Sequence, residues 1–292
     1  MVRRRAVLCG AAVWLLAGPA SARRKDARPA ETTLEAKADV IVEANVGDVD
    51  LVIETRKDGR VEVTDASLPA GFTVSLKGSA RRVEVVVRGI GIASSGRIAL
   101  SVPERARLDL HTRGGDVSVH GLRGEADVVV VRGDIAIEGA PERIRASTTS
   151  GDVRVVGVRK QAELATVSGD VVVTNPRGDL EANTVSGNVT VSGGALDRSG
   201  IAVVSGKIAF ESTLGGGNHA LAAHSGDIDV QLSSDESVRV RVETFSGDVE
   251  DALVDPPVHT RGRHERVLGD AAARLDVATF SGDVRLSPRR AG

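Results

Sequence analysis

Four regularly spaced carboxylates are the first residues in this sequence that could do chemistry. Each follows a glycine, and the interval from one to the next is constant: Asp116, Asp134, Asp152 and Asp170. If the intervening units stack, neighbouring carboxylates lie ~5 Å apart, the separation of adjacent strands. Like charges at that distance repel, and a calcium ion, which prefers hard oxygen ligands, would relieve the repulsion. A calcium ladder is therefore one interpretation of this spacing.

The same repeated position also fits residues that stabilise a turn. Asn188 follows Asp170 at the same interval and Lys207 comes next, one position later than a constant interval would place it. Negative charge is therefore not required at this position. The chain also lacks the nine-residue Gly-Gly-x-Gly-x-Asp repeat of calcium-binding β-rolls. Asp and Asn stabilise turns by hydrogen-bonding the nearby backbone. We therefore expect turn residues here and predict no metal or cofactor, with the calcium ladder as the minor alternative.

A serine precedes the glycine in most units, which could suggest a nucleophile. These serines are Ser150, Ser168, Ser186, Ser205, Ser225, Ser246 and Ser281. A catalytic serine is needed once and requires its own base, whereas a turn serine is needed in every unit. We therefore expect all seven to be turn residues.

The histidines show no metal-binding pattern. They are His111, His120, His219, His224, His259 and His264. Two pairs are five residues apart, which on a strand places the members on opposite faces, and no H-E-x-x-H motif is present. His224 stands where other units have Val167, Val185 or Phe245, so we expect it to pack on the surface across neighbouring units.

Polysaccharide lyases and hydrolases built on parallel β-helices are the enzyme class to consider. They need clustered carboxylates with a nearby base, and sugar clefts commonly use aromatic platforms. The chain has no Tyr, four Phe, and one Trp, at position 14 in the N-terminal apolar run. Cys9, the only cysteine, lies in the same run. No carboxylate pair differs from the repeated ones, so we predict no catalytic residue.

The elements that carry these residues form an internal repeat. The phrase TTSGDVRVV returns as TVSGDVVVT and TVSGNVTVS at a fixed interval. Apolar residues alternate on both sides of it, for example Val153 and Val155 after the corner and Ile144 and Ala146 before it, which indicates strands with one inward face. Units this short have no room for a crossover helix, so they must stack directly. The glycine supplies the positive φ of a tight corner. The corner glycines are Gly115, Gly133, Gly151, Gly169, Gly187, Gly206, Gly226, Gly247 and Gly282.

The predicted fold is therefore an all-β, single-domain parallel β-solenoid of roughly ten coils with ~18 residues each, a rod roughly 50 Å long. Residues 39–287 form this domain, with a β-rich N-terminal cap at 39–102 and repeat coils at 103–287. Gly47-Asp48-Val49 resembles a diverged corner within the cap. A charged loop with Pro256-Pro257 interrupts the coils at 251–274, and the long step from Asp248 to Asp283 has room to hide one degenerate unit. Residues 288–292 form a tail.

The N-terminus predicts export. Residues 1–22 have a basic start, an apolar run from Ala6 to Ala17 and a small-residue end, which is typical of a signal peptide cleaved after Ala22. The apolar run is too short for the ~20 residues of a membrane span, so we expect no stable span after cleavage. Residues 23–38 are charged and form a flexible lead. We expect a protein of the periplasm, the cell surface or the medium.

Charge gives no argument for nucleic acid or an anionic membrane, because 38 Lys and Arg nearly balance 40 Asp and Glu.

The segments Ile98–Pro103 and Leu108–Val117, with the repeated Thr-x-Ser-Gly-Asp-Val, resemble the bacterial DUF4097 family, commonly labelled adhesins. The resemblance covers residues 98–286 and, more weakly, the chain from Asp39. It implies an exported β-solenoid and transfers no catalytic residue.

The favoured hypothesis is thus a non-enzymatic adhesin or cell-envelope binding module, whose partner is an unknown envelope or extracellular protein or glycan. One alternative is a polysaccharide-active or calcium-dependent glycan-binding β-helix protein. A further alternative is a periplasmic accessory of envelope-stress signalling.

Overall fold

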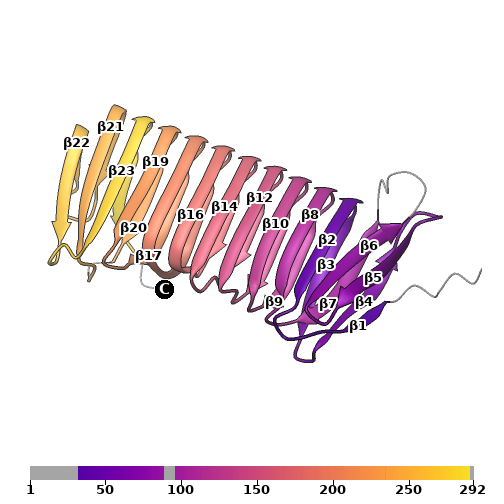
Figure 1. The fold of residues 1–292 in the computed structure, drawn as a ribbon. Helices are drawn as coiled ribbons and strands as arrows, with labels where there is room; N and C mark the ends of the chain where they lie inside the picture. The colour runs from indigo at the N-terminus through magenta and orange to yellow at the C-terminus, as the bar shows by residue number, and fades with distance from the viewer. Residues whose placement is uncertain (1–31, 89–95, 234, 290–292) are drawn as a thin grey trace, which may run out of the picture.

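The computed structural model describes residues 32–88, 96–233 and 235–289, and they form a rod of stacked β-coils (Figure 1). The described residues contain 24 strands in one continuous sheet system and no helix, so none of them provides a helix that could cross a membrane. The predicted signal peptide and residues 23–31 of the predicted lead lie outside the described residues, whereas residues 33–35 of that lead form a strand, so the flexible lead does not extend to residue 38 as expected. The prediction of an all-β parallel solenoid is confirmed.

Each regular coil has one longer and one shorter strand. The longer strands form one face of the rod, here called the long-strand sheet: β8 (Arg107–Gly114), β10 (Glu125–Arg132), β12 (Arg143–Ser150), β14 (Gln161–Ser168), β16 (Arg177–Ser186) and β19 (Asn218–Ser225). The shorter strands form the short-strand sheet: β9 (Val117–Leu122), β11 (Ile135–Gly139), β13 (Val153–Val156), β15 (Val171–Thr174), β18 (Ile208–Leu214) and β20 (Ile228–Leu232). β17 (Val189–Ser205) belongs to both, since its first part pairs with β15 and β18 and its second with β16 and β19.

The core follows from the alternation in the sequence. Ladders are parallel and nearly in register, so Thr148 faces Thr166 and Thr166 faces Thr184. The inward residues, such as Ile144 and Val153, are fully buried and stack on their counterparts in the next coil. Because each coil has only a thin apolar core, it depends on its two neighbours to exclude water.

The N-terminal end departs from sequence order. β2 (Ile41–Asp48) and β3 (Asp50–Arg56) form the coil that pairs directly with β8 and β9. β6 (Arg82–Arg88) and β7 (Arg97–Pro103) come later in the chain but stack outside that coil. Three antiparallel strands then close the end: β4 (Arg60–Ser67), β5 (Thr73–Ser79) and β1 (Thr33–Glu35). The expected corner at Gly47-Asp48-Val49 is wrong, because Asp48 pairs with Gly114 and the corner residue is Asp50.

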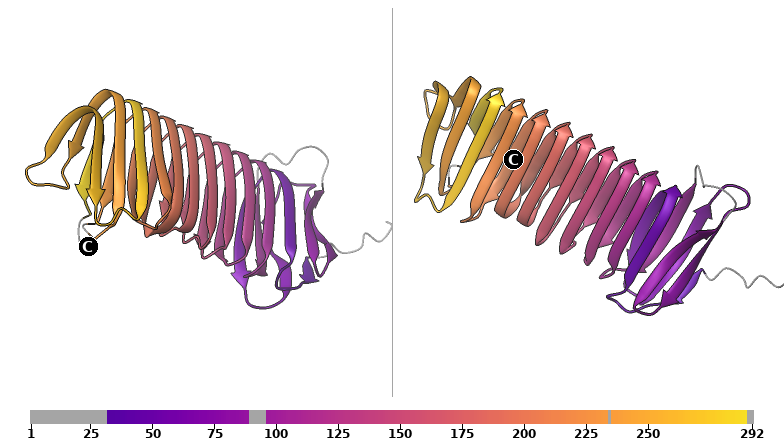
Figure 2. Two further views of the ribbon diagram at one scale, coloured as in Figure 1. Left: turned by 60° about the vertical axis from the view of Figure 1, so that its left-hand side comes forward. Right: turned by 45° about the horizontal axis from the view of Figure 1, so that its top comes forward.

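The C-terminal end shows the same exchange. The last coil, β23 (Ala273–Ser281) and β24 (Val284–Pro288), lies between the β19–β20 coil and β21 (Val238–Asp251), which precedes it in the chain (Figure 2). β22 (Val258–Leu268) pairs antiparallel with β21 and is the outermost strand. The long step from Asp248 to Asp283 therefore hides no degenerate coil. It contains a hairpin strand where the sequence suggested a loop.

Candidate binding surface

The corner aspartates link neighbouring coils through the backbone. Going up the stack, the backbone N–H at eight of these positions donates to the side-chain oxygen Oδ1 of the neighbouring coil. The pairs are Asp116 to Asp50 (3.0 Å), Asp134 to Asp116 (2.9 Å), Asp152 to Asp134 (2.8 Å), Asp170 to Asp152 (2.8 Å), Asn188 to Asp170 (2.7 Å) and Lys207 to Asn188 (2.9 Å). At the other end Asp283 donates to Asp227 (3.1 Å) and Asp248 to Asp283 (2.9 Å). We call these ten positions the corner ladder.

This geometry accounts for the tolerance of Asn188 in the ladder, since an amide oxygen accepts the same bond as a carboxylate. Lys207 has no such acceptor, and its Nζ instead lies 3.1 Å from Asp227 Oδ2. The pKa of Asp227 is lowered, first by the backbone N–H of Asp283 and then by Lys207. No group of three or more potential metal-ligating residues occurs in the described ranges. In the residues first considered for calcium, one oxygen of each carboxylate thus accepts a backbone hydrogen bond.

The corner glycines make the close stacking possible. Eight of the nine have φ between 94° and 151°, and Gly247 is the exception. A Cβ on Gly151 would lie 2.1 Å from the carbonyl oxygen of Gly133, so neighbouring corners touch through their backbones. In several units a buried threonine before the corner also joins coils, as Thr166 does by donating to the carbonyl of Gly151 at 3.1 Å. The corner motif is thus a stacking device.

The serines of the corner motif are exposed, and within the described ranges none is hydrogen-bonded to a histidine that could act as its base. The histidines are dispersed. His111 pairs with Asp109 and His120 with Glu138, both on the surface, and His259 is exposed on β22. His224 stacks on Phe280 with ring centroids 5.1 Å apart, which confirms the expected packing across coils.

A serine–histidine pair does occur, in the core. Ser199 Oγ lies 3.0 Å from His219 Nδ1, and His219 Nε2 lies 3.2 Å from the carbonyl oxygen of Gly215. Burial lowers the pKa of His219, so the neutral ring accepts from the hydroxyl and donates to the carbonyl. Both side chains are inward, at 5% and 1% exposure, where neighbouring coils have Leu180 and Leu275. A substrate on the outer face cannot reach the hydroxyl, so the pair has a structural role.

A second buried cluster fastens the terminal hairpin. Asp251 of β21 is fully buried and its Oδ2 accepts from His264 Nε2 at 2.8 Å and Arg266 Nε at 2.7 Å, both on β22. Its Oδ1 accepts from the backbone of Leu253 at 3.0 Å. Burial alone would raise the pKa of Asp251, but the hydrogen bonds from His264 and Arg266 outweigh it and lower that pKa. These residues are satisfied by each other and hold β22 on the rod.

The outer face of the long-strand sheet differs between its two halves. Over β8 to β14 it carries a network of ion pairs, in which Glu125 lies 3.4 Å from both Arg107 and Arg143. Arg143 also donates to Gln161 at 3.1 Å, and Arg145 donates to Glu163 at 2.8 Å. These side chains satisfy one another, so most of the charge on this half is paired, although Arg113 and Asp127 form no ion pair within the described ranges.

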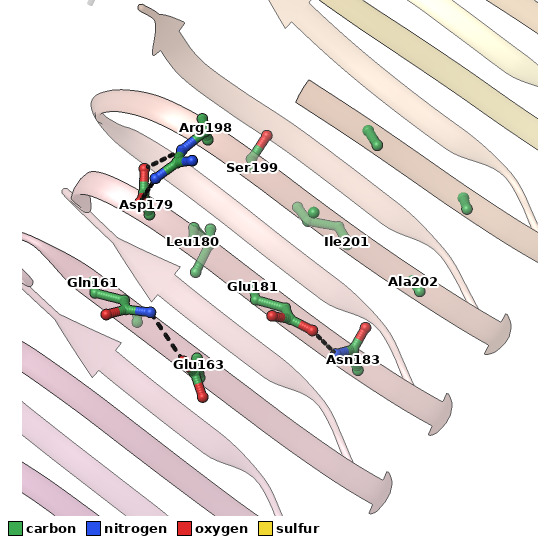
Figure 3. A pocket seen from close by; sticks show the side chains of 14 residues that line it. Gln161, Glu163, Asp179, Leu180, Glu181, Asn183, Arg198, Ser199, Ile201 and Ala202 are labelled. Atoms are coloured by element: carbon green, nitrogen blue, oxygen red, sulfur yellow. Dashed lines mark hydrogen bonds and ion pairs between the residues drawn. The ribbon is translucent and has the colours of Figure 1, made fainter. Parts of the chain in front are cut away.

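Over β17 and β19 the column of Arg145 and Glu163 continues with small residues, and over β17, β19 and β23 the next column towards the corner does so as well. Gly200 pairs with Ala220, Ala202 pairs with Ala222, and Ala222 pairs with Ala278. We call these five residues the smooth patch. A Cβ placed on Gly200 would meet no atom within 4 Å, so the surface is hollow there. Figure 3 shows the hollow, about 490 Å³, with the Asp179–Arg198 ion pair and the Glu181–Asn183 hydrogen bond at its rim.

An exposed apolar row runs along the edge of the smooth patch. It consists of the residue that precedes the corner serine in six units, in stacking order Val167, Val185, Val204, His224, Phe280 and Phe245. The valines are 45–47% exposed, Phe280 is 50% exposed and Phe245 is 80% exposed. The rings of Phe245 and Phe280 stack at 4.9 Å. We call these six residues the outer row. A second hollow of about 550 Å³ lies between it and the small residues.

Sequence reasoning placed Val167, Val185, His224 and Phe245 in one column but missed the surface they belong to. A signal was present, since the exposed positions of the units ending at Ser205 and Ser225 carry Gly and Ala where earlier units carry charge. The aromatic stack could not be found this way. Phe280 reaches its place between His224 and Phe245 only because the last coil lies out of sequence order.

Two experimentally determined structures are similar to this chain at low identity. A "putative cell adhesion protein from Clostridium sporogenes" shares 9% identity over 88% of this chain and 98% of its own, with a TM-score of 0.21. A "putative adhesin from Parabacteroides distasonis" shares 14% identity over 87% of this chain and 94% of its own, with a TM-score of 0.41. No curated protein matches the chain. The family model Toastrack DUF4097 matches residues 29–177 and 142–287. The repeated corners, the stacked coils and this match over most of the length show that the chain belongs to the Toastrack DUF4097 family.

Proposed function

We propose that the protein is an exported, non-enzymatic binding module of the cell envelope, and that its smooth patch and outer row form the docking surface for another protein. The observation that carries this proposal is the contrast within one sheet face. One half is covered by mutually satisfied ion pairs, and the other exposes contiguous small, apolar and aromatic groups. An exposed apolar patch with a polar rim is typical of an interaction site.

The chemistry of the grooves supports binding over catalysis. None of the grooves described here combines outward Asp, Arg and His in the way a polysaccharide-cleaving site would require. Asp179, one of the carboxylates that line the hollow of Figure 3, is neutralised by Arg198, with Oδ2 and Nη2 2.5 Å apart. The described histidine with a serine partner is buried on the inner side of the sheet. The exposed surface of the smooth patch and outer row is therefore suited to packing against another flat apolar surface.

Export is supported by the sequence of residues 1–22 and is tested by protease treatment of intact cells with an antibody against residues 39–287. Cleavage on whole cells, or protein in the medium, would support a surface role. Protection until the outer layer is opened would restrict the partner to the periplasm. A protein that stays in the cytoplasmic fraction would overturn the envelope role.

Docking is tested by cosedimentation of the purified protein with isolated envelopes of the source cells. Ala222→Arg places a long cation in the middle of the smooth patch and should abolish sedimentation. The matched control is Ala136→Arg, the same change on the outer face of β11 in the short-strand sheet, which should sediment like the parent protein. Equal sedimentation of all three proteins would refute the smooth patch as the docking surface.

A polar groove favours glycan binding as a second candidate function. It is a hollow of about 670 Å³ on the short-strand sheet, whose lining includes Thr190, Ser192, Asp229, Gln231 and Arg285. Hydroxyl, amide and charged groups of this kind hydrogen-bond polyhydroxylated ligands. Soluble envelope glycan that competes with sedimentation of the parent protein, but fails with Asp229→Ala, would transfer the function to this groove.

A further inference from the structure

The surface around the smooth patch complements itself. We propose that its partner is a second copy of this chain, packed face to face with the two rods antiparallel. This inference rests on the proposed function, in that it takes the smooth patch and outer row as a protein-docking surface and names the protein. The symmetry axis that the residues favour runs along β19, parallel to the strands and between the two facing sheets.

Such an axis reverses the stacking order and leaves positions along each strand unchanged. β19 therefore faces β19, the second part of β17 faces β23, and β16 faces β21. In the outer row, Val204 then faces the partner's Phe280, and Val185 faces the partner's Phe245. Small residues face one another at the centre, where Ala222 meets its own copy.

The charges at the two margins fit the same arrangement. Glu181, on β16, accepts a hydrogen bond from Asn183 at 3.2 Å and forms no ion pair within the described ranges. Arg241, on β21, is exposed and likewise has no ion-pair partner among the described residues. These two lie in one column, at equal steps on either side of β19. The axis therefore brings the free carboxylate of each copy opposite the free guanidinium of the other.

The neighbouring column of outward residues, which contains Asp179 and Arg198, is also compatible with this two-fold arrangement. Asp179 would face the partner's Arg239, and Arg198 would face the partner's Arg274. Arg198 and Arg274 are already neutralised within their own chains, by Asp179 and by Asp276 at 2.8 Å. The dimer as a whole thus gains two complementary Glu181–Arg241 ion pairs and no uncompensated repulsion between free charges.

The size of the surface sets the expected strength. Five coils at ~4.8 Å by seven residues at ~3.3 Å give roughly 550 Å² on each copy, or roughly 1,100 Å² in total. That is at the low end for a specific interface, which implies a reversible dimer and not an obligate one. The antiparallel arrangement places the N-terminal caps at opposite ends of the dimer.

The test is a charge swap followed by sedimentation velocity over a concentration series. The full-length mature protein should dimerise reversibly. Glu181→Arg and Arg241→Glu should each weaken dimerisation about tenfold or more, because each puts two pairs of like charges face to face. An equimolar mixture of the two variants should form the heterodimer as readily as the parent forms its homodimer, since both pairs are then complementary. The double variant should also recover.

Arg154→Glu is the matched control, because Arg154 is exposed on β13 in the short-strand sheet and should leave dimerisation unchanged. A parent protein that stays monomeric to several hundred micromolar overturns the inference, as does a dimer that the single swaps do not weaken or the mixture does not restore. The proposed function can fail separately. A monomeric parent whose envelope binding is lost in Ala222→Arg keeps the docking surface and excludes the second copy as its occupant.

Discussion

Replacing one corner aspartate should separate the hydrogen bond of the corner ladder from its charge. Asp152 Oδ1 accepts from the backbone of Asp170 at 2.8 Å, while the backbone of Asp152 donates to Asp134. Asp152→Ala removes the acceptor and the charge, whereas Asp152→Asn removes the charge and keeps the acceptor. The ladder already contains this second chemistry, because Asn188 Oδ1 accepts from Lys207 at 2.9 Å.

The magnitudes decide what each variant should show. A carboxylate ~5 Å from its neighbours repels each by about 0.8 kcal/mol in bulk water, and salt reduces that further. Both variants remove this repulsion, so it cancels between them. The difference between them is one hydrogen bond from a backbone N–H, worth about 1 kcal/mol. We therefore expect Asp152→Ala to be about 1 kcal/mol less stable than Asp152→Asn.

Urea unfolding followed by circular dichroism measures this difference, since the described residues contain no tryptophan to report by fluorescence. The m-values must agree between variants, because stacked repeats can lose two-state behaviour. Asp152→Asn should match or exceed the parent at low salt, and the margin should shrink in about 1 M salt. Equal midpoints for the Ala and Asn variants would refute the hydrogen-bonded ladder and leave the aspartate a local turn residue.

Four further predictions follow from the buried groups and the ladder. Burial raises the pKa of Glu236, so the parent loses stability as pH rises through 4.5, and Glu236→Gln should be more stable in urea at pH 7, by on the order of 1 kcal/mol, but not at pH 4. The lowered pKa of Asp251 contributes stability above pH 3.8 that is lost as pH falls; Asp251→Asn should cost about 3 kcal/mol at pH 7 and should expose the β21–β22 hairpin to trypsin. His219→Leu combined with Ser199→Ala should flatten the loss of stability below pH 6.5, because the unfolded chain takes up the histidine proton first; an unchanged pH profile would contradict a neutral buried ring. Millimolar calcium should not move the urea midpoint, since one oxygen of each of Asp116, Asp134, Asp152 and Asp170 already accepts a backbone hydrogen bond, and an upward shift would revive the calcium ladder.

The regular coils could be predicted because their information is local. A fixed period, alternation around Val153 and Val155, and a glycine at each corner all concern residues within one unit. The structure adds a reason for the threonine as well, since Thr148 and its counterparts bond the glycine carbonyl of the next coil. That bond spans units, so no pattern inside one unit could show it.

The stacking order of the terminal coils could not be predicted, because no residue pattern within one unit specifies which coil packs next to it. The coil of β23 and β24 has the same Thr-x-Ser-Gly-Asp motif as the coil of β21, so either could have packed next to β19. The hairpin is consistent with the observed order. Asp251 with His264 and Arg266 holds β22 against β21, and the coil that follows β22 in the chain pairs with the other edge of β21. The first corner lies at Asp50, which no Ser-Gly-Asp motif marks. The sequence pattern therefore predicted the corner at Asp48, two residues earlier.

The way the ends are closed also determines where this rod can associate. An open strand edge is the usual route by which β-proteins join end to end, and charged edge residues discourage it. Here antiparallel strands cap the first coil, and the outermost strand at the other end presents Arg261 and Arg263, both more than 80% exposed. Those arginines form ion pairs with Asp248 and Glu243 of β21, and as charged residues on the outermost strand they discourage pairing with a further strand. Because charge on the outermost strand discourages end-to-end pairing, the smooth patch remains the surface that we propose for contact between two rods. Association through a face is also limited to one partner per face, which makes a closed dimer, not a filament, the expected assembly.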